Sequence, residues 1–317
     1  MTPSTAVKLP LDTKPAMPAP ARPADVVSLP EAKTVPAPAA AAAKPPAAKV
    51  KRWLRIHRAD MKSWGIGAVA LLAFLGFWHV ATVYRLDIYI RFLNVPTPAA
   101  VFERGLHAFA NPRFVKNVTI SIQRIALGFA LATLVAVPLG LIMGRFRPVR
   151  DWIYPVSEIL RPIPAIAWVP MSIMLWPTTE SSIVFITFLG SFFPIVINTL
   201  HGMVTLDKVL VRAARSLGAG EWQLFWEVYL PGTLPHVFTG LTVGMGVAWV
   251  SLIAAEMISG QFGIGYFTWE SYSLIQFADV VLGMACIGIL GLISSWLIRA
   301  AGAIAMPWFT RAARQTK

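Results

Sequence analysis

Five stretches of this chain carry no formally charged residue and are long enough to cross a lipid bilayer. They contain 22, 20, 26, 28 and 19 residues and lie at 63–84, 125–144, 181–206, 228–255 and 280–298. A spanning helix needs about 20 mostly apolar residues, and only helices or closed barrels satisfy their backbone polar groups in hydrocarbon. No run alternates apolar and polar residues, so helices are predicted. A sixth apolar stretch, 161–177, contains Pro162, Pro164 and Pro170, which would kink or break a helix.

The composition indicates that lipid is the solvent for most of the chain. Of the 317 residues, 56% are hydrophobic and 14% are charged, whereas soluble proteins carry roughly a quarter charged residues. We therefore predict an all-α integral membrane protein with six transmembrane helices, in a domain that covers residues 63–310. The six spans are expected at about 63–84, 118–144, 152–177, 181–204, 233–257 and 279–304.

The two ends of the chain differ from this domain. Residues 1–50 hold 11 of the 25 prolines and 14 alanines, and such a segment cannot bury enough apolar surface to offset its ordering entropy. We predict a disordered cytoplasmic tail there, followed by a basic segment at 51–62 that lies at the membrane surface. Residues 311–317 form a second basic tail.

Positive charge beside the spans predicts the orientation of the chain. The net charge is +13, and six Lys or Arg residues lie between positions 49 and 62, just before the first span. Basic residues collect on the cytoplasmic side of membrane helices, so we expect a multi-pass protein of the inner membrane, surrounded by lipid, with a cytoplasmic N-terminus. The outer loop at 85–116 also carries five basic residues, which opposes this assignment. Nucleic acid is not expected as a partner.

A polar loop at residues 205–232 separates spans four and five and is therefore predicted to be cytoplasmic. Asp207 fits the N-cap of a short helix, Gly218 fits a left-handed residue after it, and Pro231 is expected to end a second short helix. Apolar residues recur at helical spacing in both helices: Leu210, Ala213, Ala214 and Leu217, then Trp222, Phe225, Trp226 and Tyr229. The pattern predicts a rigid bracket. It either packs only on its own bundle or presents a surface to another protein.

This loop resembles the coupling loop of permease subunits in bacterial ATP-binding-cassette importers. That family carries Glu-Ala-Ala, three residues, Gly, nine residues, Ile, one residue and Leu-Pro, and the matching positions here are Ala213, Ala214, Gly218, Val228, Leu230 and Pro231. Arg212 stands where the family usually has glutamate, so the bracing role of that glutamate cannot be transferred. The resemblance implies that the turn at Leu217, Gly218 and Ala219 lies in a groove of a separate ATPase and moves with it.

The resemblance covers roughly residues 63–310. The segments LRPIPAIAWVP, FFPIVINTLHG, PHVFTGLTVGMGVAW and SLIAAEMISGQFGIGYFTWESY are similar to the branch that imports nitrate, bicarbonate, cyanate, sulfonates and taurine. This implies a type I importer permease fold and a homodimer of two permease copies. It also implies cassette ATPase subunits on the cytoplasmic side and a periplasmic or lipid-anchored solute-binding protein on the other. The solute would be a small anion.

Ionisable and polar residues within the spans are candidates for the translocation pathway. Charges inside a membrane are costly and generally face a partner or a watery path. Arg161 could attract a passing anion, and Glu256 could either pair with Arg161 in one state or repel the anion near the outer mouth. Pro164, Asn198 and Thr199 are further candidates for lining the pathway. Alternatively, Arg161 and Glu256 extend to the two membrane interfaces, and the polar residues only bond between helices. Arg124, near a span end, is predicted at an interface.

Two other classes of protein remain as alternatives. A stand-alone secondary transporter or channel favours an internal repeat of spans, and no clear repeat is seen. A membrane enzyme needs a nucleophile with its base or a metal cluster, and no such set is visible. No G-x-x-x-x-G-K-[ST] phosphate loop occurs in the sequence, so ATP hydrolysis is expected on another subunit. We predict neither a metal nor a cofactor. Two G-x-x-x-G pairs, 140/144 and 240/244, predict helix-packing faces.

Overall fold

The computed structural model describes residues 46–86 and 92–309. The chain divides into two compact units, Met1–Ile66 and Gly67–Lys317. The described part of the first unit is the beginning of helix α1 (Pro46–Val83). This helix includes the basic segment at 51–62 and the last residues of the predicted tail at 1–50. The rest of that tail, and the tail at 311–317, lie outside the described residues.

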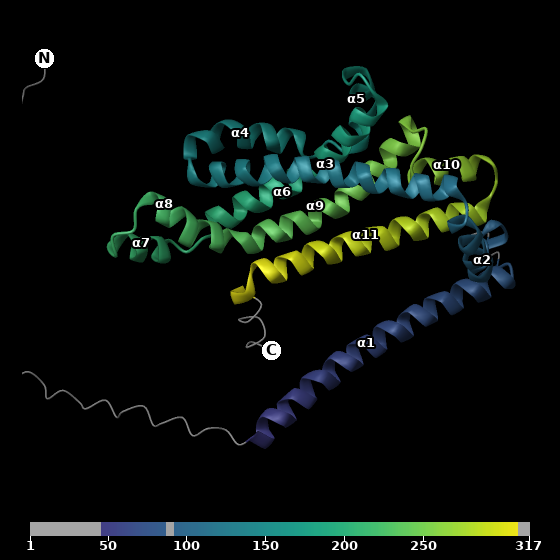
Figure 1. The fold of residues 1–317 in the computed structure, drawn as a ribbon, viewed down its shortest axis with the longest axis horizontal. Coiled ribbons are helices and arrows are strands. Elements are labelled where there is room, and N and C mark those ends of the chain that lie inside the picture. The colour runs from purple at the N-terminus through teal and green to yellow at the C-terminus, as the bar shows by residue number, and fades with distance from the viewer. Residues whose placement is uncertain (1–45, 87–91, 310–317) are drawn as a thin grey trace, which may run out of the picture. The chain divides into compact units, whose positions relative to one another are not determined.

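The second unit is built from helices, and no strand occurs in 46–86 or 92–309 (Figure 1). After α1 the α-helices are α2 (Pro98–Phe109), α3 (Pro112–Arg145), α4 (Arg147–Leu160), α5 (Val169–Leu175), α6 (Thr179–Val204), α7 (Lys208–Ser216), α8 (Glu221–Leu224), α9 (Leu230–Ser259), α10 (Ile264–Ser273) and α11 (Phe277–Ala305). Three short elements complete the order: the 3₁₀ helices η1 (Phe92–Asn94) and η2 (Ala165–Trp168) and the π-helix η3 (Phe225–Tyr229).

Within residues 46–86 and 92–309, five helices are long and apolar enough to cross a membrane. They are Gly65–Val83, Pro112–Arg145, Thr179–Val204, Glu221–Ile258 and Phe277–Ala305. A sixth candidate is the pair Arg147–Leu160 and Ala165–Leu175, which is bent by 90° at the proline-rich stretch. The predicted all-α membrane fold is confirmed, and the expected break after Arg161 is a sharp corner between α4 and η2.

Glycines let α3, α6 and α9 pack closely at the centre of the second unit (Figure 1). A Cβ atom on Gly140 would lie 2.6 Å from the Cβ of Thr199, and one on Gly144 would lie 2.3 Å from the Cβ of Met203. Gly240 and Gly244 approach α6 in the same way from α9. Both G-x-x-x-G pairs are therefore packing faces within a single chain, as small residues in membrane helices often are.

The helix that was expected to end at Pro231 continues instead. From Glu221 to Ser259 the chain is helical throughout, with the π turn Phe225–Tyr229 just before Pro231. In that wider turn the N–H of Leu230 bonds the carbonyl of Phe225 five residues back. A proline ring normally collides with the carbonyl of the preceding turn, and a π bulge changes the position of that carbonyl. The prediction that Pro231 ends the second short helix was therefore wrong.

Candidate functional site

The connection between α6 and α9 forms a bracket made of α7, a glycine turn and α8. Asp207 caps α7, since its Oδ1 accepts from the N–H of Val209 at 2.7 Å. At the other end Gly218 has a φ of 87°, and the N–H groups of Gly218 and Ala219 bond the carbonyls of Arg215 and Ala214 at 3.0 and 3.1 Å. These two bonds define a Schellman motif, which needs a left-handed residue at the glycine position. Both predicted caps are confirmed.

Charged side chains fasten the bracket to the bundle. Glu221, the first residue of α8, accepts from Arg215 of α7 at 2.8 Å and also from Arg145 at the end of α3. Arg212, at the position of the family glutamate, donates within its own helix to the Lys208 carbonyl at 3.4 Å. In this chain Glu221, Arg215 and Arg145 join the bracket to the end of α3, and Arg212 is not among them. Sequence reasoning did not identify this set.

The tip of the bracket exposes apolar side chains. Leu217 is 89% exposed and Trp222 is 74% exposed, and three other apolar residues of the bracket are also exposed: Val209, Leu210 and Trp226. Ala213 lies on the exposed side of α7, whereas Val228, Leu230 and Pro231 are half-buried where the bracket joins α9. Exposed apolar side chains gathered on a short, capped turn are typical of a docking site for another protein. We call this surface, formed by Val209, Leu210, Leu217, Trp222 and Trp226, the docking tip.

Three of the five predicted pathway residues share a cavity. Arg161, Pro164 and Asn198 line a hollow of about 390 Å³ between the α4–η2 corner, α6 and α9. Thr199 is buried instead, and its hydroxyl donates to the carbonyl of Ile195 on its own helix. Glu256 is also buried and does not line this cavity.

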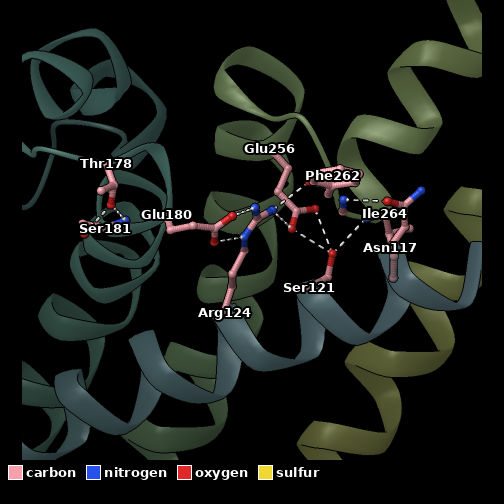
Figure 2. Close-up of polar contacts among 10 residues, drawn as sticks. Asn117, Ser121, Arg124, Thr178, Glu180, Ser181, Glu256, Phe262 and Ile264 are labelled. Atoms are coloured by element: carbon pink, nitrogen blue, oxygen red, sulfur yellow. Dashed lines mark hydrogen bonds and ion pairs between the residues drawn. The ribbon is translucent and has the colours of Figure 1, made fainter. Parts of the chain in front are cut away.

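Glu256 pairs with Arg124 rather than with Arg161 (Figure 2). The Arg124 side chain is 3% exposed and the Glu256 side chain 0%, with 2.9 Å between Nη1 and Oε1. Arg161 lies 3.4 Å from Glu158, one turn away on its own helix segment. The Arg161–Glu256 pair is therefore absent from this structure. Arg124, predicted at an interface, has a side chain that is buried against partners that lie far away in the sequence.

The same cluster holds the loop between α9 and α10. The N–H groups of Gly263, Ile264 and Gly265 donate to Asn117, Ser121 and Glu256 at 3.1, 2.8 and 2.9 Å. Arg124 donates to the Phe262 carbonyl at 2.7 Å. The signal that could have revealed this cluster is the spacing of Asn117, Ser121 and Arg124, which places three polar side chains on one face of α3.

The bracket and this cluster lie at opposite ends of α9 (Figure 1). The bracket leads into Leu230. The loop between α9 and α10, which we call the glycine loop, follows Ser259, so a helix of 30 residues separates the bracket from this loop. At 1.5 Å per residue this helix is about 45 Å long, enough to cross a bilayer. The arrangement suits a protein that connects events on the two sides of a membrane.

Residues 136–315 match the family described as the inner membrane component of binding-protein-dependent transport systems. The matched segment is more than half of the chain and includes the bracket. The chain belongs to this family. As a member, it is a multi-pass inner-membrane permease component of a transport system that depends on a binding protein, which confirms the importer permease prediction over a stand-alone transporter or channel.

Named relatives of this permease are similar over most of its length. A protein of Methanocaldococcus jannaschii, named as an ABC transporter permease, is 38% identical over 68% of this chain and 81% of its own length. The taurine transport system permease protein TauC of Escherichia coli is 33% identical over 77% of this chain and 88% of its own length. The nitrate import permease protein NrtB of Synechocystis is 32% identical over 63% of this chain and 76% of its own length. The nitrate and taurine branch suggested by the sequence is thereby supported.

Proposed function

We propose that this permease forms the translocation pathway of an ATP-driven importer for a small oxyanion. The observation that carries the proposal is the docking tip, held on a capped and ion-paired turn with Leu217 pointing out of the protein. A cassette ATPase would seat the tip in a groove, and ATP hydrolysis would take place on that subunit. The named functions of the relatives, nitrate import and taurine transport, support an oxyanion as the solute, since nitrate and the sulfonate of taurine both present several oxygens around one charge.

The bracket can transmit motion because it is continuous with two central helices. α6 runs into it at Val204 and α9 leaves it at Leu230, and both helices are packed against each other. A displacement of the docking tip would therefore move both helices together, as in transporters that alternate between packed arrangements. In the assembly we propose two permease copies in a homodimer within the lipid, an N-terminus in the cytoplasm, and a periplasmic or lipid-anchored solute-binding protein on the outer side.

The cavity at Arg161, Pro164 and Asn198 is proposed as part of the pathway. The Arg161 side chain is half exposed there, with Glu158 as its near partner. We expect Arg161→Gln to lower uptake on the order of fivefold, because a partly exposed charge attracts an anion by ~1 kcal/mol. Arg147→Gln, the same change at the start of α4 and outside this cavity, serves as the control. Equal uptake by both variants, at equal assembly, would remove Arg161 from the pathway.

Reconstitution tests the proposed function as a whole. Proteoliposomes containing the permease, its cassette ATPase and the binding protein are expected to accumulate nitrate, bicarbonate or taurine when ATP is supplied. Omitting the ATPase or the binding protein should reduce accumulation to the level of empty liposomes. Accumulation by the permease alone, driven by an ion gradient, would show that the chain is a secondary transporter and that the docking tip has another role.

A further inference from the structure

Arg124 holds two carboxylates that differ in how firmly each is bound (Figure 2). On one side Glu256 is fully buried and accepts from Arg124, from the Ser121 hydroxyl and from the N–H of Gly265. On the other side Glu180 of α6 is 61% exposed, and both of its described contacts are with Arg124. One partner is therefore part of the core, whereas the other can leave the guanidinium and be solvated.

The exposed side of this pair opens into a large cavity. Arg124 and Glu180 lie in the wall of a hollow of about 760 Å³ between α3 and α6, with an apolar surround that includes Trp176, Phe185 and Phe188. Arg124 does not need Glu180 to stay in place, because Glu256 and the Phe262 carbonyl hold its Nη1 at 2.9 and 2.7 Å. The Nε and Nη2 atoms, which face Glu180, are available in a fixed orientation if that carboxylate moves away.

We propose that the Nε–Nη2 edge of Arg124 is a binding site for the transported oxyanion, and that the Glu180 carboxylate occupies it when no solute is present. A guanidinium binds planar or multi-oxygen anions through two parallel N–H bonds, and carboxylate, nitrate, bicarbonate and sulfonate all offer this geometry. When a solute anion replaces the Glu180 carboxylate, one negative charge replaces another, so the total charge in contact with Arg124 stays the same. The inference rests on the proposed function only in taking a small oxyanion as the solute.

Anion-dependent stabilisation of the full-length permease tests this site without any transport step. The melting temperature is measured in lipid nanodiscs against increasing nitrate, bicarbonate or taurine, with chloride at equal ionic strength as the reference. Glu180→Gln removes the competing charge. The midpoint, the concentration at which an oxyanion gives half of its maximal increase in melting temperature, should therefore be about tenfold lower than in the wild type for at least one oxyanion. Arg124→Lys keeps a cation for Glu256 but loses the planar fork, so the oxyanion effect should disappear.

Glu270→Gln is the matched control. Glu270 of α10 pairs with Arg113 on the surface, so the same loss of charge occurs outside the cavity, and the oxyanion midpoint should not change. The proposal is overturned if Glu180→Gln leaves the midpoints of all three oxyanions as in the wild type, or lowers the melting temperature without any oxyanion dependence. It is also overturned if chloride acts as well as the oxyanions. Because no ATPase is present, failure of coupling and failure of this site are distinguishable.

Discussion

Gly218→Val is expected to lower solute-stimulated ATP hydrolysis and co-purification with the ATPase about tenfold or more. Gly218 has a φ of 87°, where a β-branched residue is a steric outlier. An ordinary L-residue in this conformation costs roughly 1–2 kcal/mol, and valine costs more. The bonds from Gly218 and Ala219 to the end of α7 would be lost, and Leu217 would no longer be held at the tip. Since 1.4 kcal/mol is a factor of ten, coupling should fall about tenfold or more.

The bracket contains its own control for this substitution. Gly220 lies two residues further on, has an ordinary φ of −72°, and a Cβ atom there would meet nothing within 4 Å, as at Gly218. Gly220→Val should therefore retain most of the coupling. Gly218→Asn should also retain it, because asparagine adopts the left-handed region more readily than other residues. Equal loss in Gly218→Val and Gly220→Val would show that added bulk matters and the turn does not.

Gly263→Ala is expected to cause a large loss of stability, although it adds a single methyl group to the loop between α9 and α10. Its φ of 118° is unsuited to alanine, and the new Cβ would lie 2.3 Å from the Glu256 carboxylate. The carboxylate would have to move away from Arg124, and disturbing one partner of a buried ion pair typically costs 3–5 kcal/mol. We expect a loss of at least ~3 kcal/mol, seen as a lower melting temperature of the purified permease.

Gly246→Ala provides the comparison for this prediction. Gly246 is an exposed residue within α9, and a Cβ atom there would meet nothing within 4 Å. In a helix interior alanine is favoured over glycine by up to ~1 kcal/mol, so this variant should melt at the same temperature or slightly higher. If both alanine variants melt like the wild type, the glycine loop is not held against Glu256 as the structure has it.

Local signals in the sequence predicted the local features of the bracket. Asp207 and Gly218 act through neighbours two to four residues away, so their roles as caps follow from the order of residues alone. Long uncharged runs likewise predicted the spans, because burial in lipid depends on composition. The continuation of the helix through Pro231 was not predicted, since no composition rule indicates a π turn in advance.

Partners that are distant in the chain could not be assigned from the sequence. Arg124 bonds Glu180 and Glu256, which lie 56 and 132 positions away, and only the packing of α3 against α6 and α9 brings them together. Glu256 was therefore matched with Arg161, the other conspicuous charge within an apolar stretch. The same limit applies to Glu221, whose partner Arg145 is 76 positions away on α3.

Site-directed cross-linking at the docking tip tests the central claim most directly. Cys286 is the one cysteine of the chain, so Cys286→Ala provides a background in which Leu217→Cys, or the exposed Leu274→Cys beyond α10 as a control, carries a photoactivatable cross-linker. In membranes that contain the complete transport system, position 217 should form an adduct with the cassette ATPase and position 274 should not. Efficient labelling at position 217 with no ATPase adduct, while transport continues, would contradict the account.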